Sequence, residues 1–441
     1  GLNLPRDPHY YRKELDLRLS CSYGPGRYDI DYEDNGIDYP YAYVRWTEQR
    51  NMEAFLDLIA GGRINIRSLI THTFDISDAE KAYDIVMGKV KEPHIGILLK
   101  YQSNPGKHKT IFTIKSEPAK GINIGFIGAG SFAQSYLLPN INKVEASLET
   151  VVTSKGITAT NVAKKFGFNN SSSSGTDILN NTAINTVFVA TQHNTHAEYV
   201  LACLRNKKCV FVEKPLAMNV NELEEIRDVY EKNGGALLVG FNRRFAPVAT
   251  DLKAAFKSVN EPVVMNYRVN AGFIPKEHWT QQPEIGGGRI IGEICHFIDL
   301  MQFFSDSLPI EVFAQSINTA NQEKINHDNL IINLRFANGS IGTITYVANG
   351  NKLVSKEKFE IFGGGKAGSI NDFKGGELFA GSKLTQLKSN GKGHKQEVEA
   401  FISAVKSGGN MPISFESIYA TTQATFAIID SLITGLPQQI R

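Results

Sequence analysis

The chain has 441 residues, of which 42% are hydrophobic and 21% are charged, and its formal net charge is +2. This length predicts two or three domains, and the small net charge argues against a nucleic-acid surface built on bulk positive charge. No apolar run is long enough to span a bilayer, and the first residues lack the apolar core of a signal peptide, so neither feature is expected. Four isolated cysteines without metal or redox spacing favour a reducing, cytoplasmic compartment.

Residues 1–100 have their own pattern of predicted elements. A strand that ends in a Gly-Pro-Gly turn is predicted over 15–29, and apolar residues at helical spacing predict a helix over 50–62. A short strand and a second helix are predicted over 70–89, followed by a strand over 94–101. The next stretch, 102–120, is polar, contains Pro and Gly, and is typical of a linker.

The block 1–101 resembles the C-terminal end of zinc-type medium-chain alcohol dehydrogenases. The matching residues are Ile70-Thr71-His72-x-Phe74 and Ala79-Glu80-Lys81-Ala82-Tyr83. The glycine fingerprint and the catalytic zinc ligands of that family are missing from the block, so the resemblance implies a remnant without that activity. Because the chain begins with Gly, we expect it to be the tail of a longer, two-enzyme polypeptide. Without partner ligands in the block, His72 is expected to be structural.

Residues 121–245 are predicted to form a dinucleotide-binding Rossmann domain. An apolar strand over 122–127 runs into a G-x-G-x-x-A fingerprint, and a helix follows up to Pro139. The first glycine of such a motif permits a tight turn, and the second lets a pyrophosphate approach the backbone at a helix N-terminus. The expected cofactor-binding residues of this motif are Gly128, Gly130, Ser131, Phe132 and Ala133.

Strands and helices alternate after the fingerprint. Near-continuous apolar strands within 148–155, 183–208, 208–219 and 236–247 predict a parallel, doubly wound sheet, whereas the polar stretch 169–177 is predicted to be a loop.

The end of the strand over 148–155 bears on the choice of cofactor. In NAD-binding versions of the motif, an Asp or Glu there holds the ribose hydroxyls. Here the strand ends in Thr153-Ser154-Lys155, without a carboxylate. A hydroxyl and an ammonium group suit a 2′-phosphate, so Ser154 and Lys155 favour NADP over NAD; the alternative is that Lys155 is a solvated loop residue.

From about residue 121 to 441, the chain resembles the glucose–fructose oxidoreductase / inositol dehydrogenase (Gfo/Idh/MocA) family. Five motifs match in order: Gly128-Ala129-Gly130, Thr191-Gln192-His193-Asn194-Thr195-His196, Glu213-Lys214-Pro215, Gly240-Phe241-Asn242-Arg243-Arg244-Phe245, and the Gly-Gly-Gly…His element at 286–296. Two positions depart from the family pattern: Gln192 replaces a Pro, and Gly292 replaces the Asp of Asp-x-x-x-His. The resemblance implies an NAD(P)-dependent oxidoreductase acting on a sugar or sugar derivative.

The resemblance also implies a division of roles in the site. Lys214 is expected to be a catalytic lysine that hydrogen-bonds the reacting oxygen, after a cis Lys214–Pro215 bond. His296 is expected to act as acid/base or to bind a substrate hydroxyl, and Glu293 is considered as a replacement for the missing carboxylate. Further cofactor contacts are expected from Thr191, Asn194, His196, Glu213 and Lys214; for His196, which opens a helix, the alternative is a capping or packing role. Of the two arginines that end the last Rossmann strand, Arg243 is expected to contact substrate and Arg244 to be a salt-bridged surface residue. Trp279 is expected to cover a sugar face from its position alone, in the loop before the glycine turn. No metal site is expected.

The remaining residues, 246–441, are predicted to form an α+β domain with an open, predominantly antiparallel sheet. Alternating apolar and polar residues and glycine turns carry this prediction, and Gly363-Gly364-Gly365 is expected to be a hairpin turn. By resemblance, the sheet supports the substrate helix and forms a homo-oligomer interface. The alternative function is a catalytically inactive, cofactor-binding scaffold or regulatory module, which the Gly292 departure keeps open.

Overall fold

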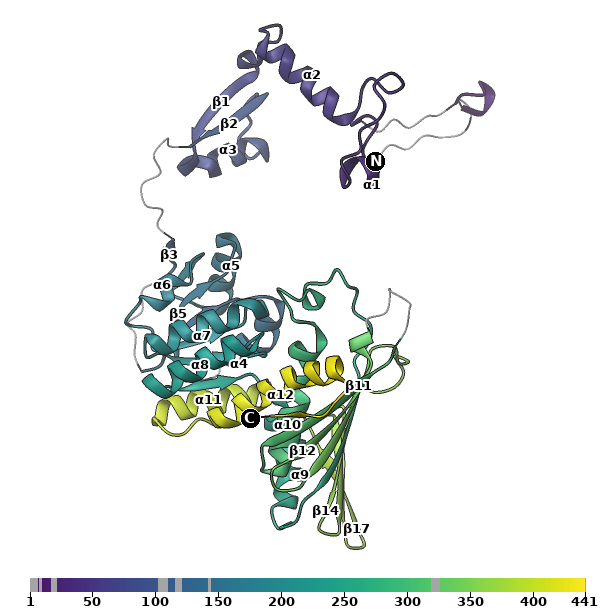
Figure 1. Ribbon diagram of the computed structural model, residues 1–441. Coiled ribbons are helices and arrows are strands. Elements are labelled where there is room, and N and C mark those ends of the chain that lie inside the picture. The colour runs from purple at the N-terminus through teal and green to yellow at the C-terminus, as the bar shows by residue number, and fades with distance from the viewer. Residues whose placement is uncertain are drawn as a thin grey trace. The chain divides into compact units, whose positions relative to one another are not determined.

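The computed structural model describes residues 7, 10–16, 22–101, 110–115, 121–141, 144–318 and 326–440. The chain separates into two compact units, Gly1–His108 and Lys109–Arg441 (Figure 1). Parts of the predicted strand over 15–29 and of the predicted linker over 102–120 lie outside the described residues. Within the described residues, no helix is both long enough and apolar enough to cross a membrane.

Among its described residues, the first unit contains a small parallel sheet and three α-helices. Strands β1 (Ile70–Asp75) and β2 (Gly96–Lys100) pair in parallel, and helix α3 (Ala79–Val86) buries Ala82 and Ile85 against them. Helix α2 (Glu48–Ala60) begins at a Thr47 N-cap, as the apolar spacing predicts a helix there, but buries none of its residues. Helix α1 is a single turn (Ile30–Glu33).

The second unit begins with a seven-stranded Rossmann sheet. Its strands, in spatial order, are β3 (Ile111–Thr113), β6 (Asn170–Ser172), β5 (Ser147–Val152), β4 (Asn123–Ile127), β7 (Thr186–Val189), β8 (Cys209–Val212) and β9 (Leu237–Val239). All pairs are parallel except β3 with β6. Every residue of β4 and β7 is buried, which is why these strands are apolar on both faces.

Strand β6 lies in the polar stretch 169–177, which was predicted to be a loop, so that prediction was wrong for 170–172. The local sequence, Asn-Ser-Ser, has low strand propensity, but the edge of β5 offers backbone groups that need partners. Ser171 and Ser172 are buried, and the Asn169 side chain donates to Glu149 at 3.1 Å. Tertiary pairing therefore overrides local preference here.

Helices α5 (Gly156–Phe166), α6 (Thr176–Leu179), α7 (His196–Arg205) and α8 (Val220–Asn233) connect the Rossmann strands. The helix after the fingerprint includes a π-helical turn, Ala133–Leu137, and continues past Pro139 as α4 (Leu138–Ile141). Helix α11 (His394–Ser407) arrives from far along the sequence, and Phe401 packs edge-on against Phe188 and Phe211 of the sheet. The Rossmann core is thus completed by a segment that the sequence assigned to the following domain.

The second sheet has nine strands over the described residues, and among their pairs only β10 with β13 is parallel. The order is β17 (Lys383–Lys388), β16 (Gly375–Ala380), β15 (Lys366–Asn371), β14 (Glu357–Gly363), β10 (Val264–Asn270), β13 (Ile341–Val347), β12 (Leu330–Phe336), β11 (Pro309–Ser316) and β18 (Gln438–Gln439). Gly364 and Gly365 connect β14 to β15 with φ of +57° and +69°, which is the predicted hairpin turn.

One face of this sheet packs on helices α9 (Pro247–Phe256), α10 (Cys295–Ser305) and α12 (Phe415–Thr434), which share a single core with the strands. On the other face, Val264, Ile341 and Phe362 lie side by side on neighbouring strands and are exposed. This fold confirms the prediction of a Rossmann domain followed by a domain with a mostly antiparallel sheet. Helix α10 is the element that carries His296 toward the Rossmann strands.

Candidate active site

A cavity of about 1230 Å³ lies where the Rossmann strands end. Residues that follow β4, β5, β7 and β8 line it, and β4 stands between β5 and β7 in the sheet. Chain connections leave such a position in opposite directions, so a crevice forms at the carboxyl ends of the strands. The cavity therefore occupies the place where doubly wound sheets bind nucleotides.

The fingerprint glycines form the wall of this cavity. Gly128 has φ of +91°, and a Cβ added to it would lie 2.6 Å from the backbone of Ala190, so only glycine fits. A Cβ added to Gly130 would have no atom within 4 Å, which leaves room for a phosphate beside the backbone. The helix beginning at Ser131 directs its free N–H groups to the same place. These residues fit a dinucleotide.

Ser154 and Lys155 line the same cavity, after the end of β5, and both are exposed. The Thr153 hydroxyl donates to the Lys155 carbonyl at 2.7 Å and fixes the turn into α5. Thr158, which the sequence did not single out, lies beside them on the cavity wall.

The loop after β7 divides into residues that line the cavity and one that does not. Thr191 and His196 line it, whereas Asn194 is exposed outside it, contrary to the expected cofactor contact. His196 is fully buried, and its two ring nitrogens lie 2.8 Å from the Pro215 carbonyl and 3.2 Å from the Thr191 carbonyl. Burial lowers the pKa of His196 to about 4, so this neutral ring ties the loop to the segment that carries Lys214.

Lys214 reaches from the end of β8 to the helix of the second domain. Its Nζ donates to the carbonyl oxygen of Gly292 at 2.9 Å, and the Lys214–Pro215 bond is cis, as the resemblance implies. The neighbouring Glu213 is buried, and burial raises its pKa to about 7. Glu213 lines the cavity, and a Cβ on Gly240 would lie 3.0 Å from its carboxylate, so this carboxylate packs against the residue that follows β9.

His296 lies one helical turn after Gly292 and lines the cavity with Lys214. The ring is buried, and Nδ1 has no hydrogen-bond partner among the described residues. Burial, and the positive charges of Arg243 and Lys214, lower its pKa well below 6.5. The imidazole is therefore neutral at neutral pH and can accept a proton or a hydrogen bond.

Glu293 lines the cavity but is held by three other side chains. Its carboxylate accepts from Tyr346 at 2.6 Å and Lys356 at 2.9 Å, and pairs with Arg289 at 2.9 Å. Although burial opposes ionisation, Lys356 and Arg289 lower its pKa to about 2. This arrangement suits a fixed negative charge, and the carboxylate considered as a replacement for the missing Asp is bound to Tyr346, Lys356 and Arg289 rather than to His296.

Arg243 lines the cavity, but its guanidinium is directed into the second domain. Its Nε and one Nη donate to Glu357 at 2.7 and 3.0 Å, and Lys392 and Tyr267 bind the same carboxylate at 2.6 and 2.7 Å. Arg244, expected on the surface, instead makes a bidentate pair with the buried Asp299 at 2.6 and 2.9 Å. The expected substrate contact of Arg243 therefore competes with an ion pair already made.

Trp279 lines the cavity as expected, and its ring meets the edge of His193, a residue that the sequence did not assign to the site. The ring centroids are 4.9 Å apart. His193 belongs to a quoted motif, but at a position with no implied role. The sequence did show a histidine next to the Gln192 departure. That histidine could be linked to the site only once the structure showed that residues 193 and 292 are adjacent. Tyr199 and Arg289 were missed in the same way.

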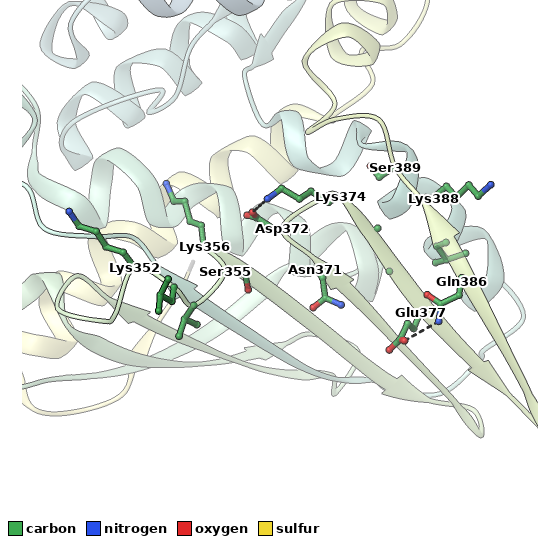
Figure 2. A pocket seen from close by; sticks show the side chains of 15 residues that line it. Lys352, Ser355, Lys356, Asn371, Asp372, Lys374, Glu377, Gln386, Lys388 and Ser389 are labelled. Atoms are coloured by element: carbon green, nitrogen blue, oxygen red, sulfur yellow. Dashed lines mark hydrogen bonds and ion pairs between the residues drawn. The ribbon is translucent and has the colours of Figure 1, made fainter.

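A second hollow, of about 950 Å³, lies on the second sheet (Figure 2). Lysines dominate its polar wall, and Lys374 pairs with Asp372 at 3.2 Å while Gln386 donates to Glu377 at 3.1 Å. It contains no histidine or cysteine, so we do not assign chemistry to it. In the part of the chain that the structure describes, no group of three His, Cys, Asp or Glu side chains could hold a metal ion.

Two models of one protein family match the chain. Residues 122–241 match the model of an oxidoreductase family with an NAD-binding Rossmann fold, and residues 258–432 match the C-terminal α/β domain of the same family. Myo-inositol 2-dehydrogenase of Thermotoga maritima is 27% identical over 194 residues, which span 42% of this chain and 56% of that enzyme. The chain thus aligns with little more than half of that relative.

Two further likenesses cover more of the chain. Levoglucosan dehydrogenase of Pseudarthrobacter phenanthrenivorans is 22% identical over 381 residues, spanning 71% of this chain and 96% of the enzyme. The solved structure of a levoglucosan dehydrogenase in complex with NADH and levoglucosan superposes with a TM-score of 0.65, at 21% identity, covering 73% of this chain and all of that one. Both the family models and the fold agree, and the chain belongs to the Gfo/Idh/MocA oxidoreductase family.

Proposed function

We propose that this protein transfers a hydride between a nicotinamide cofactor and a CH–OH carbon of a sugar or sugar derivative. The observation that carries the proposal is that Lys214 and His296, from different domains, line one cavity with the fingerprint. Relatives named for inositol, levoglucosan and 1,5-anhydro-D-fructose support a polyol-like substrate.

The residues suggest a simple division of work. A nicotinamide cofactor whose pyrophosphate is held by the fingerprint would supply the hydride acceptor or donor. The Lys214 Nζ donates a hydrogen bond to the reacting oxygen in place of its present partner, the Gly292 carbonyl. In the oxidation direction, the neutral His296 accepts the proton of the hydroxyl; in reduction it returns that proton. Glu293 and Arg289 hold the helix turn between these two groups.

The test is NAD⁺ or NADP⁺ reduction with a panel of cyclic polyols and anhydrosugars that includes myo-inositol and levoglucosan. Lys214→Ala and His296→Ala should each lower kcat by about 10²–10⁴-fold, the range for a positioned acid/base group, and His296→Ala should change cofactor binding little. If both variants keep full turnover, the proposed roles are wrong.

We propose NADP as the favoured cofactor, because Ser154 and Lys155 line the cavity after β5 and no carboxylate ends that strand. Calorimetric titration of NADPH and NADH into wild type and Lys155→Ala tests this. A selective loss of NADPH affinity in the variant is expected. Binding of neither cofactor would instead favour the alternative, an inactive scaffold module.

For the first unit, we propose a remnant of a zinc-type alcohol dehydrogenase without activity of its own. Its support is the order of elements β1, α3 and β2, and a His72 whose ring bonds Thr71 and Glu92 rather than a metal-ligand set. Lys214→Ala in the full chain should then abolish all nicotinamide-linked turnover with alcohols and polyols. Residual alcohol oxidation would contradict the proposal.

We also propose a cytoplasmic homo-oligomer. Cys203, Cys209 and Cys295 are free thiols, which suits a reducing compartment. The exposed row Val264, Ile341 and Phe362 on the second sheet offers an apolar face for a second copy. Light scattering on wild type and Ile341→Lys should show an oligomer that the substitution weakens; a monomeric wild type would contradict the proposal.

A further inference from the structure

His193 occupies the space that a side chain at position 292 would need. A Cβ added to Gly292 would lie 3.0 Å from Cε1 and 3.4 Å from Nδ1 of His193. A side chain at 292 would therefore require the His193 ring to move from its present position by a few tenths of an ångström. The Gly292 departure and the histidine at 193 are thus one structural feature, made by two segments far apart in the sequence.

The ring is held in a defined orientation. Its Nδ1 lies 2.8 Å from the carbonyl oxygen of Gly286, and because a carbonyl only accepts, Nδ1 carries the proton. The Trp279 ring packs against the His193 ring in an edge-to-face arrangement. The other nitrogen, Nε2, then has a free lone pair. It has no partner within the described ranges, and it is not sealed from solvent as Nδ1 of His296 is.

The charge around the ring keeps this lone pair available. Burial and the nearby Lys214 lower the pKa of His193 to about 3, so the ring stays neutral at neutral pH. Lys214 donates to the carbonyl of Gly292, the residue against which His193 packs. A hydrogen-bond donor and a neutral hydrogen-bond acceptor therefore flank the same helix turn, and both line the cavity.

We propose that His193 binds the substrate: its Nε2 accepts a hydrogen bond from a second hydroxyl, while Lys214 donates to the reacting oxygen. This inference rests on the proposed function and specifies its substrate class. A neutral acceptor requires a donor, so the site selects a polyol with a free hydroxyl beside the reacting one over an analogue that lacks it. An analogue without that hydroxyl would leave the Nε2 acceptor unpaired in the complex, and a site that leaves a polar group unpaired discriminates strongly against such an analogue.

The experiment uses the full chain and the polyol of the panel that wild type turns over fastest. His193→Phe keeps an aromatic ring against Trp279 and Gly292 but removes both the Nε2 acceptor and the Nδ1 donor to the Gly286 carbonyl, whereas His193→Gln restores a polar side chain. For loss of one hydrogen bond to substrate, we expect His193→Phe to raise KM about 10-fold with NADPH affinity close to wild type, while the lost bond to Gly286 lowers Tm. His193→Gln should recover part of the loss, and carries the test alone if the Phe variant does not fold.

Deoxy analogues of the same polyol, each lacking one hydroxyl next to the reacting carbon, provide the matched control. With the analogue that lacks the bound hydroxyl, wild type and His193→Phe should have equal KM values. The inference is overturned if wild type is active and His193→Phe keeps its KM within 2-fold for the intact polyol. Absence of turnover by wild type with every member of the panel, by contrast, overturns the proposed function together with this inference.

Discussion

The two halves of the cavity are built in different ways. The cofactor half is made of backbone close together in sequence: Gly128 turns, Gly130 leaves space and the next helix begins at once. The substrate half is made of buried charged side chains joined over long sequence separations, such as Arg243 with Glu357. The cofactor half depends on the space and the backbone conformations that glycine permits. The substrate half depends on buried charges that neutralise one another. The two halves should respond differently to substitution.

The largest effect should come from Glu357→Gln in the substrate half. Glu357 is 1% exposed and binds Arg243, Lys392 and Tyr267. Removing one member of a buried ion pair leaves the other charge uncompensated, at a cost of about 3–5 kcal/mol. Denaturant unfolding measures this. The exposed pair Arg335–Glu311 is the control, and Glu311→Gln should cost less than about 1 kcal/mol. Equal costs would contradict the comparison.

The same ion pair predicts a loss of stability in acid. Arg243 and Lys392 hold the pKa of Glu357 well below its ordinary value of 4.5 despite burial. Its stabilisation is therefore fully present above the unfolded pKa and is lost as the pH falls from there toward the lower folded pKa. Between pH 7 and 3, wild type should lose more unfolding free energy than Glu357→Gln does. Parallel pH profiles for the two proteins would contradict this.

In the cofactor half, Gly128→Ala should destabilise the fold and remove cofactor binding. A positive φ and a backbone contact at 2.6 Å leave no room for the methyl group. Such strain costs about 1–3 kcal/mol, and any relief by moving the backbone displaces the turn. Thermal unfolding with and without NADH measures both effects. A stable variant that binds NADH normally would show that the turn is not what the structure indicates.

Glu293→Gln tests the boundary between the two halves. The variant keeps the shape but loses the charge that faces Lys356 and Arg289, so we expect a cost of about 1–3 kcal/mol. Because the pKa of Glu293 is already about 2, its ionisation should not shape the pH–rate profile between pH 5 and 9. A limb of that profile that disappears in the variant would show that Glu293 titrates during turnover and would contradict this prediction.

Gly130→Ala should have the smallest effect on stability and a clear effect on binding. Its Cβ meets no atom within 4 Å, so the unfolding free energy should change by less than about 0.5 kcal/mol. The methyl group would, however, occupy the space left for the phosphates, and NADH affinity should fall. Titration calorimetry beside unfolding separates the two readouts. Together with Gly128→Ala, this variant distinguishes a glycine needed by the fold from one needed by the ligand.

The features of this fold that depend on local spacing could be predicted from the amino-acid sequence. Glycine spacing after an apolar strand predicted the fingerprint, and the alternation of strands and helices predicted the Rossmann domain. Alternating side chains with glycine turns predicted the second sheet, including the hairpin at Gly364. The motifs also pointed to Lys214 and His296 as parts of one site, and the structure brings them to one cavity because Lys214 follows β8 and His296 lies at the start of α10.

The partners of side chains and of strand edges could not be predicted in this way, because they are set by contacts between distant parts of the chain. It made Asn-Ser-Ser a strand because β5 offered unpaired backbone groups, and it placed α11 on the Rossmann core. It bound Arg243 to a carboxylate 114 positions away and set His193 over Gly292. These contacts depend on which surfaces pack together in the fold. The role of a buried charge, or of a glycine without a Cβ, is set by the residue packed against it, which can be far away in the sequence.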